Sequence, residues 1–393
     1  MISITKLLCG TEYYGDSLRY SESSSSQRSG AAAGHGPVAA WNITRACNLK
    51  CRHCYASARS GPGEELTYQE AVSFLNDLAA FRVPALLLSG GEPVSRPDFF
   101  DLISHAGKLG LRLTLSTNGT LITPDAAKKI KDAGVSYVGV SLDGMREIND
   151  SFRGLKGAFD SALQGIRNCL SVGQKVGLRF TVNRHNLSEI ESIFKLIETE
   201  NIPRVCFYHL AYAGRGTEMS NQDITEAEKR SVLDLIMERV LDYQRRGLQK
   251  EVLTVNNHAD GVYVYLKLLG SSNPRAEEVY RLLKNNGGNR SGVALGAVDW
   301  DGNVHPDQFT LQHTFGNIRE RPFSEIWQDA GHPLMAGLRN RRSLLKGRCG
   351  ACRWLDLCNG NSRTRAEAAR GDFWASDPAC YLNDQEIGLK QQV

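Results

Sequence analysis

The hydrophobic residues of this chain fall into short apolar runs that alternate with segments that read as helices. The runs are five or six residues long and lie at 37–42, 85–89, 112–116, 137–141, 177–182 and 204–208. The helical segments between them lie at 67–81, 98–109, 124–133, 159–172 and 187–200. Strands that are buried on both faces of a parallel sheet read as apolar runs, and alternation with helices favours right-handed crossovers. We therefore expect an α/β fold.

Six strand–helix units are too few for a closed eight-stranded barrel, so the expected architecture is a partial (β/α)6 parallel barrel. Residues 225–246 read as a long amphipathic helix, and 252–255 are compatible with a further strand. A stretch rich in Gly and Asn at 285–292 indicates a domain boundary, and Asp301-Gly302 predicts a hairpin turn. We expect an N-terminal arm with a serine-rich linker in 1–36, the barrel in 37–285 and a cysteine-rich domain in 286–393.

Composition narrows the class of protein. The 393 residues are 41% hydrophobic and 23% charged, as in soluble globular proteins. No run approaches the ~20 apolar residues of a membrane span, and residues 1–6 lack the charged-then-apolar order of a secretory signal. The net charge of +4 is too small to indicate nucleic acid binding. We expect a cytoplasmic protein whose partners include neither membranes nor nucleic acids.

The ten cysteines are distributed unevenly. Three of them lie within eight residues with the spacing C-x₃-C-x₂-C: Cys47, Cys51 and Cys54. Four more lie near the C-terminus: Cys349, Cys352, Cys358 and Cys380. Tight groups in a chain without a secretory signal indicate metal ligation rather than disulfides. Three thiolates leave one iron of a four-iron cluster open to a small molecule, whereas four close the cluster. A structural zinc site is the alternative for both groups.

Polar motifs follow the expected strands at the end where parallel sheets place their functional sites. They are Gly90, Gly91 and Glu92 after the second strand, Ser116 and Asn118 around the end of the third, Ser141 and Asp143 around the end of the fourth, and Arg179 and Asn183 on and after the fifth. Glycines let the backbone approach a ligand, and hydroxyl and carboxylate groups can bind ribose hydroxyls. Helix capping and turn formation are the alternative roles of these polar residues.

The cysteine motif that ends in Cys54-Tyr55, followed on the next strand by Gly90-Gly-Glu-Pro93, resembles the signature of the radical S-adenosylmethionine (SAM) enzymes. The resemblance implies the partial barrel, a 4Fe–4S cluster on the three cysteines, and SAM bound to its open iron. Reductive cleavage of SAM then yields a 5′-deoxyadenosyl radical. The resemblance implies that Gly90, Gly91 and Glu92 hold the methionine ammonium of SAM, and that Ser141 and Asp143 contact its ribose. It also implies Arg179 and Asn183 at the SAM carboxylate, and His53 and Tyr55 beside the cofactor. Ser116 and Asn118 are further candidates for the ribose hydroxyls.

The C-terminal cysteines resemble the SPASM/twitch type of auxiliary domain, with a matching lead-in at 315–318 and 323–327. The resemblance implies one auxiliary 4Fe–4S cluster, hence two clusters in all. This chain has Asp307 where the pattern often has a cysteine, so Asp307 or His305 could replace one thiolate. The basic run from Arg339 to Arg348 could bind substrate carboxylates or form a solvated face.

Further stretches, among them 37–45, 254–261 and 347–354, resemble the tetrapyrrole-modifying members of the family, above all those of haem d1 biosynthesis. The resemblance implies 12,18-didecarboxysirohaem as the substrate and radical removal of two propionate side chains. Members of the alternative haem pathway share these motifs and remove acetate side chains from the same substrate. His258 is the candidate catalytic residue, either as a ligand of the tetrapyrrole iron or as a proton donor. Its alternative role is structural, as a histidine that caps a helix and has its hydrogen bonds made within the protein.

Two other functions fit parts of the pattern. Many proteins with SPASM domains modify peptides, but residues 1–36 are too short and serine-rich for a peptide-recognition domain. A non-catalytic cluster-binding scaffold would need no SAM pocket, yet polar motifs follow consecutive strands. A radical SAM enzyme also needs an electron donor, and a flavodoxin or ferredoxin is the expected partner.

Overall fold

One mixed sheet organises the molecule in the computed structural model, which describes residues 1–20, 36–61, 63–329 and 331–389. The strand order is β1-β8-β7-β6-β5-β4-β3-β2-β9-β10-β11. The strands are β1 (Ile2–Ser3), β2 (Val38–Thr44), β3 (Leu86–Gly90), β4 (Leu113–Thr117), β5 (Tyr137–Ser141), β6 (Val176–Val182), β7 (Arg204–His209), β8 (Glu251–Val255), β9 (Leu295–Val298), β10 (Asn303–His305) and β11 (Gly316–Asn317). Except for Gly36, the expected serine-rich linker lies outside the described residues.

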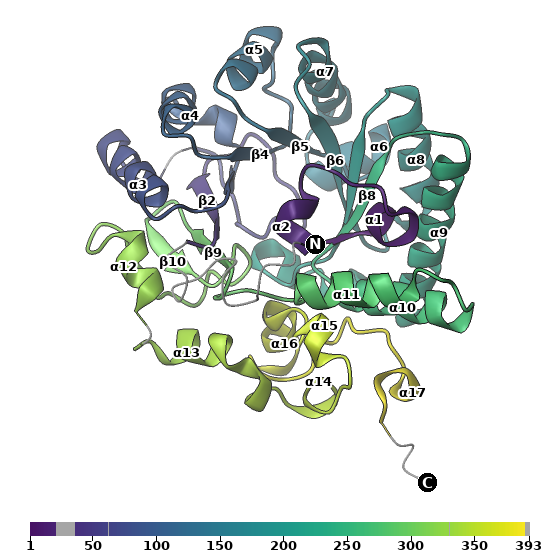
Figure 1. The fold of residues 1–393 in the computed structure, drawn as a ribbon. Coiled ribbons are helices and arrows are strands. Elements are labelled where there is room, and N and C mark those ends of the chain that lie inside the picture. Colours follow the sequence, from purple (N-terminus) through teal and green to yellow (C-terminus); the bar gives the residue numbers. More distant parts are fainter. Residues whose placement is uncertain (21–35, 62, 330, 390–393) are drawn as a thin grey trace.

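The six expected strands are β2 to β7, and each pairs in parallel with the next. Figure 1 shows them as an open arc with helices on its outer side. The α/β class and the partial parallel barrel are therefore confirmed. The helices are α1 (Ile4–Cys9), α2 (Asp16–Tyr20), α3 (Tyr68–Ala80), α4 (Phe99–Lys108), α5 (Pro124–Asp132), α6 (Arg146–Arg153), α7 (Ala158–Ser171), α8 (Ile190–Thr199), α9 (Glu226–Arg245), α10 (Ala259–Gly270), α11 (Ala276–Asn286), α12 (Phe323–Gln328), α13 (Pro333–Arg339), α14 (Gly347–Gly350), α15 (Leu355–Cys358), α16 (Arg363–Arg370) and α17 (Asp384–Ile387).

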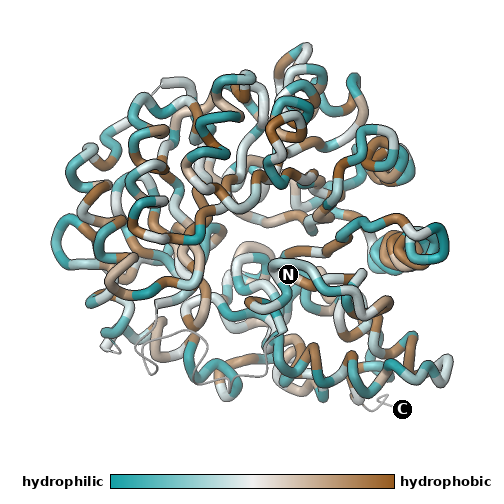
Figure 2. Tube along the Cα trace, turned by 45° about the horizontal axis from the view of Figure 1, so that its top comes forward, coloured by the Kyte–Doolittle hydropathy of each residue, from teal (hydrophilic) through white to brown (hydrophobic). Residues whose placement is uncertain are grey.

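Local sequence explains where the outer helices begin and which face they bury. Thr67 and Thr225 start α3 and α9 with reciprocal capping boxes, in which the threonine hydroxyl and a glutamate three residues later satisfy free backbone amides. The buried face of α3 includes Phe74, Leu75 and Leu78, at helical spacing. Figure 2 shows the same division along the chain, with hydrophobic stretches toward the sheet and hydrophilic turns outside.

The sheet extends beyond the six expected strands at both edges. Strand β8 adds in parallel to β7, and β9 adds in parallel to β2, so residues far apart in sequence share the sheet. Strands β9 and β10 form the antiparallel hairpin expected around Asp301-Gly302, where Gly302 has a φ of +87°. Strand β1 pairs with β8, and helix α1 packs against α9 and β8. Residues 2–9 of the N-terminal arm thus pack on the β8 edge of the barrel sheet, and the division at residue 36 stays a prediction.

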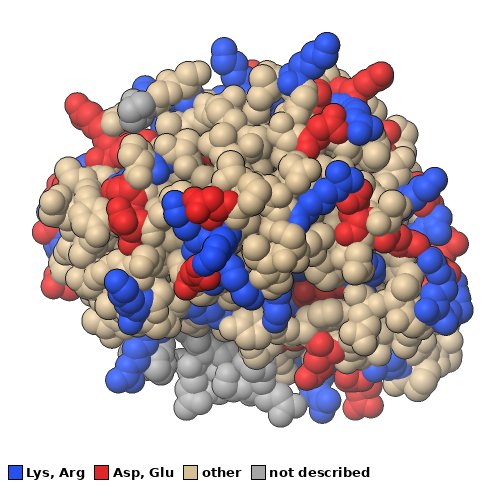
Figure 3. All heavy atoms as spheres, turned by 90° about the horizontal axis from the view of Figure 1, so that it is seen from above, with Lys and Arg blue, Asp and Glu red and all other residues tan. Residues whose placement is uncertain are grey.

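The C-terminal part begins after α11, which ends at Gly287 in a left-handed conformation. The short helices α13 to α16 lie below the barrel in Figure 1. A division at residue 286 stays a prediction, because β9 continues the barrel sheet across it. No helix in the described ranges is long and apolar enough to cross a membrane. Acidic and basic side chains are interspersed over the face shown in Figure 3.

Candidate active site and auxiliary cysteine site

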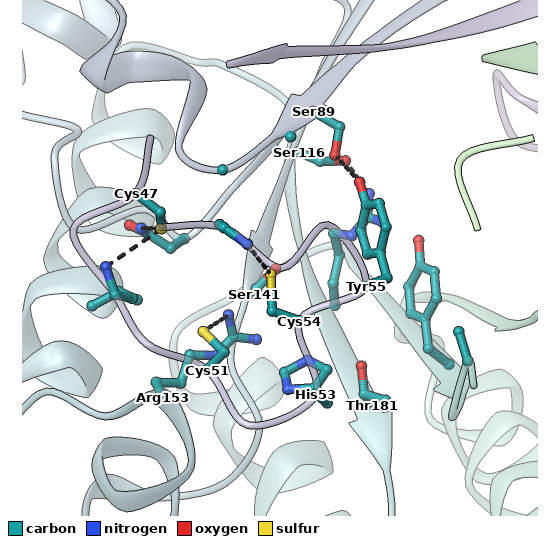
Figure 4. A pocket seen from close by; sticks show the side chains of 18 of the residues that line it. Cys47, Cys51, His53, Cys54, Tyr55, Ser89, Ser116, Ser141, Arg153 and Thr181 are labelled. Carbon is teal, nitrogen blue, oxygen red and sulfur yellow. Dashed lines mark hydrogen bonds between the residues drawn. The ribbon is translucent and has the colours of Figure 1, made fainter. Parts of the chain in front are cut away.

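The loop after β2 brings Cys47, Cys51 and Cys54 into the wall of one cavity at the ends of the parallel strands (Figure 4). The cavity encloses about 920 Å³, including its open mouth. Of the residues expected at a cofactor, the following also line it: His53, Tyr55, Gly90, Gly91, Ser116, Asn118, Ser141 and Arg179. The predicted residues therefore come together in the structure from four strands and one loop.

Each of the three thiols has a hydrogen-bond donor. The backbone N–H of Leu49 lies 3.4 Å from Sγ of Cys47, and that of Ala58 lies 3.4 Å from Sγ of Cys54. Nη1 of Arg153 lies 3.6 Å from Sγ of Cys51. Burial raises the pKa of Cys47 to about 12 and also raises the pKa of Cys51, so the thiols need a cation to become thiolates. A cation bound by these sulfurs would favour the thiolate form, and the three donors would then stabilise the charged sulfurs.

The glycine motif sets how closely β3 approaches the cysteine loop. A side chain at Gly91 would overlap the carbonyl oxygen of Ala46, and one at Gly90 would overlap that of Thr44. The chain instead makes close backbone hydrogen bonds, from Gly91 N–H to Thr44 at 2.7 Å and from Glu92 N–H to Ala46 at 2.8 Å. The glycines therefore hold the start of the cysteine loop against the end of β3.

Glu92 does not line the cavity in this structure. Its carboxylate is fully buried and accepts hydrogen bonds from the Thr117 hydroxyl at 2.7 Å and from the backbone N–H of Asn118 at 2.7 Å. Burial raises the pKa of Glu92, which these donors oppose. The carboxylate ties the ends of β3 and β4 together. Its expected contact with the SAM ammonium stays a prediction.

Asp143 and Asn183 also lie behind the cavity wall rather than in it. Asp143 is fully buried, forms an ion pair with Arg153, and accepts the backbone N–H of Thr181 at 2.7 Å. Asn183 is fully buried, and its amide donates to the Thr181 carbonyl at 2.9 Å. Their expected contacts with the ribose and the carboxylate of SAM stay predictions. Ser141, at the end of β5, does line the cavity.

His53 and Tyr55 both line the cavity, and each is fixed by contacts of its own. The His53 ring stacks on Phe152 at a centroid distance of 4.7 Å, and burial lowers the pKa of His53 to about 4. The Tyr55 hydroxyl lies 3.0 Å from Oδ1 of Asn42 and 2.8 Å from Oγ of Ser89. His53 is therefore a neutral, stacked ring at neutral pH.

Several residues of this wall were missed by sequence reasoning. They are Arg153, Thr181, Tyr208, His209, Arg215 and Phe309. Tyr208 and His209 end β7, so the rule applied to the other strands would have found them. Arg153 ends α6, and Arg215 lies in the short 3₁₀ helix Gly214–Thr217 after β7; no local pattern marks either residue.

The four C-terminal cysteines line a second cavity of about 440 Å³, together with Trp354, Asn361 and Asp377 among others. Burial raises the pKa of Cys380 to about 12, and the pKa values of Cys352 and Cys358 are raised for the same reason. In the described part of the chain, no group of three or more His, Cys, Asp and Glu side chains has the spacing of a site for one metal ion. Both cysteine groups surround a space.

The two suggested replacement ligands do not line the second cavity. The Asp307 carboxylate accepts hydrogen bonds from Phe309 N–H at 2.8 Å and the Thr310 hydroxyl at 2.6 Å. The His305 ring contacts the His313 carbonyl through Nδ1 and Asp299 through Nε2. Of the basic run, Arg348 alone lines this cavity.

His258, the candidate catalytic residue, lines neither cavity. Its backbone N–H donates to Oδ1 of Asn361 at 2.8 Å, and Nδ1 is buried without a hydrogen-bond partner. Burial lowers the pKa of His258 well below its usual value. The residue joins the end of β8 to the C-terminal segment, and its catalytic role stays a prediction.

Comparison with known proteins identifies the same two cysteine-containing regions as iron–sulfur or SAM domains. Residues 41–197 match the radical SAM superfamily, and residues 295–353 match SPASM, an iron–sulfur cluster-binding domain. The chain is 54% identical over 395 residues to Fe-coproporphyrin III synthase of Methanosarcina barkeri, which covers 99% of each chain. It is 44% identical to pre-heme d1 synthase of Dinoroseobacter shibae, over 91% of this chain and 89% of that one.

A solved structure shares the fold. Streptococcus suis SuiB bound to precursor peptide SuiA matches with a TM-score of 0.70 at 17% identity, over 89% of this chain and 76% of that one. At this identity the match shows the fold alone.

The radical SAM and SPASM domains of this chain imply binding of 4Fe–4S clusters and of SAM. The chain belongs to the radical SAM superfamily, as a SPASM-containing enzyme of haem-related biosynthesis.

Proposed function

We propose that the enzyme removes two acetate side chains from 12,18-didecarboxysirohaem and so forms Fe-coproporphyrin III. The observation that carries the proposal is the 54% identity to Fe-coproporphyrin III synthase over 99% of both chains. Coproporphyrins keep four propionates and carry methyl groups at the other positions, so their formation from this substrate requires loss of acetate and retention of propionate. Acetate removal was the alternative to propionate removal in the sequence analysis, and the relatives favour it.

The first cavity is the proposed site of SAM. Cys47, Cys51 and Cys54 would hold a 4Fe–4S cluster there, and the cluster with SAM supplies the 5′-deoxyadenosyl radical when a reduced flavodoxin or ferredoxin provides an electron. Ser116 and Ser141 would orient the nucleoside, and the neutral His53 ring would pack beside adenine.

Cationic side chains in the same cavity suit a substrate with many carboxylates. Arg179 donates to the Ser116 hydroxyl and lies over the Tyr208 ring at 4.7 Å. Arg215 donates to the carbonyls of Cys51 and Ala58 at 2.9 and 2.7 Å. Neither guanidinium has an acidic partner among the residues that the structure describes. Both can therefore pair with carboxylates of SAM or of the tetrapyrrole.

The second cavity is the proposed site of one auxiliary 4Fe–4S cluster, held by Cys349, Cys352, Cys358 and Cys380. Four thiolates close such a cluster, so it would exchange electrons rather than bind SAM. Two clusters per chain are proposed in all. Zinc remains the alternative occupant and is distinguished by iron and sulfide analysis.

Removal of propionate side chains is the second candidate reaction. It is supported by the 44% identity to pre-heme d1 synthase. Both reactions share the radical, the cavity and the substrate, so the products decide between them.

The test is an anaerobic reaction with reconstituted, reduced protein, SAM and didecarboxysirohaem. We measure 5′-deoxyadenosine and the mass of the tetrapyrrole. Loss of two acetate-sized groups supports the proposal, and loss of propionate-sized groups replaces it with the second candidate. Deoxyadenosine with an unchanged tetrapyrrole refutes both substrate assignments. A Cys51→Ala variant, which lacks one of the three cysteines, is the control for SAM-dependent turnover.

A further inference from the structure

His209, the last residue of β7, lines the first cavity and is held from behind by a buried carboxylate. Its Nε2 lies 2.9 Å from Oδ2 of Asp260, which sits in the first turn of α10 and is 1% exposed. Oδ1 of the same carboxylate accepts the Tyr381 hydroxyl at 2.8 Å. Burial alone would raise the pKa of Asp260, but the bonds from His209 and Tyr381 hold it below its usual value. Asp260 is therefore an anion that can only accept hydrogen bonds.

An anionic acceptor at Nε2 determines the tautomer of the imidazole. Nε2 of His209 must carry a hydrogen, so in the neutral ring Nδ1 keeps its lone pair. Among the described residues, no group forms a hydrogen bond with Nδ1. Nδ1 is also absent from the buried polar atoms that lack a partner, so it is accessible rather than buried. The side chain is 12% exposed. A carboxylate behind one ring nitrogen and a free lone pair on the other is the arrangement of metal-ligating histidines.

Two neighbouring histidines lack this arrangement. His53 lies within the cysteine loop, and its Nδ1 is buried without a partner. Nε2 of His53 is 3.4 Å from Asp143, whose same oxygen is already paired with Arg153. His258 lines neither cavity. His209 therefore combines a supporting carboxylate with access to the space where a substrate fits.

We propose that Nδ1 of His209 is an axial ligand of the iron in the tetrapyrrole substrate. The inference rests on the proposed function, because the substrate brings the iron. The hydrogen bond to Asp260 fixes the tautomer of the imidazole and holds its orientation. Tyr381 follows Cys380, a residue of the second cavity wall, so the carboxylate behind His209 is anchored on the segment that carries the auxiliary thiols. The support of His209 is thus linked to the segment that carries the auxiliary cysteines.

The test uses the full, anaerobically reconstituted chain with ferric coproporphyrin III and metal-free coproporphyrin III as probes. In His209→Gln the amide can still donate to Asp260 but is a poor iron ligand. We expect the affinity for the ferric probe to fall about tenfold or more, in the range seen when metal sites lose support. The affinity for the metal-free probe should stay unchanged. His209→Tyr should replace the imidazole-type Soret band and electron paramagnetic resonance (EPR) signals of the wild type with those of a phenolate-ligated iron.

The matched control is His313→Gln. His313 also pairs with a carboxylate, Glu367, at 2.9 Å, but it lines neither cavity. This variant should bind both probes as the wild type does. SAM cleavage without tetrapyrrole checks that each variant assembles its cluster.

Two sets of results separate the inference from the proposed function. An imidazole-type spectrum in both His209 variants, or an equal loss of affinity for the two probes in His209→Gln, overturns the inference alone. A wild type that cleaves SAM but binds neither probe and leaves didecarboxysirohaem unchanged overturns the proposed function and the inference with it.

Discussion

The ion pair between Arg153 and Asp143 should dominate the stability of the cysteine loop. Arg153→Met keeps most of the side-chain volume but removes the positive charge. Asp143 is fully buried and Arg153 is 8% exposed, so the carboxylate would stay in a medium of low polarity with only the Thr181 N–H and the His53 ring beside it. Removal of one partner of such a pair costs about 3–5 kcal/mol. The same change removes the hydrogen bond to Cys51.

We expect the free energy of unfolding of the cluster-free, reduced protein to fall by about 3 kcal/mol or more, a large part of a typical total of about 5–15 kcal/mol. Anaerobic urea denaturation followed by circular dichroism measures this change. The double variant Asp143→Asn/Arg153→Met, which buries no charge, should regain most of the lost stability. Arg146→Met breaks an ion pair with Asp160 on the surface and should leave the midpoint unchanged. A single variant within about 1 kcal/mol of the wild type would refute the reasoning, since it would mean that water or another group solvates Asp143.

Three further predictions concern the glycine motif, the auxiliary site and a buried histidine. Gly91→Ala should lose SAM cleavage because its Cβ overlaps the Ala46 carbonyl, whereas Gly270→Ala, with open space around it, should keep SAM cleavage; equal activity in both variants would contradict the close approach. Cys380→Ser should bind about four fewer irons per chain yet still cleave SAM, since the sites are separate; unchanged iron content would exclude a cluster on that thiol. Burial lowers the pKa of His258, so the unfolded chain binds an extra proton below pH ~6.5 and stability falls as the pH drops. His258→Gln should flatten this fall in urea titrations from pH 7 to 5; a fall as steep as that of the wild type would show that another group causes it.

Predictions from sequence succeeded where a feature is local or periodic. The apolar runs identified β2 to β7, and the C-x₃-C-x₂-C spacing placed three thiols on one loop because that spacing spans a single turn region. The strand-end rule found Ser116, Ser141 and Arg179 in the cavity wall. It missed His209 only because it was not applied to β7.

The features that sequence reasoning missed depend on contacts between distant segments. Residues 145–153 were not expected to be a helix, yet α6 carries the Arg153 that pairs with Asp143. Glu92 and Asp143, both predicted to contact SAM, also join strands and loops, and no local pattern indicates this second role. A sequence pattern shows that a carboxylate follows a strand. It does not show whether the folded chain pairs that carboxylate with a neighbouring cation.

The sequence by itself therefore determined the α/β class, the order of the barrel strands and the two groups of thiols, because backbone periodicity and short loops act within a few residues. The tertiary structure decided which polar groups face the cavity. Asp260 lies 51 residues from His209 and 121 from Tyr381, and only the pairing of β7 with β8 and the return of the C-terminal segment bring them together. A buried carboxylate stays charged only where donors form hydrogen bonds with it, as His209 and Tyr381 do with Asp260. Because Nε2 of His209 makes this bond, its other ring nitrogen is left free to face the cavity.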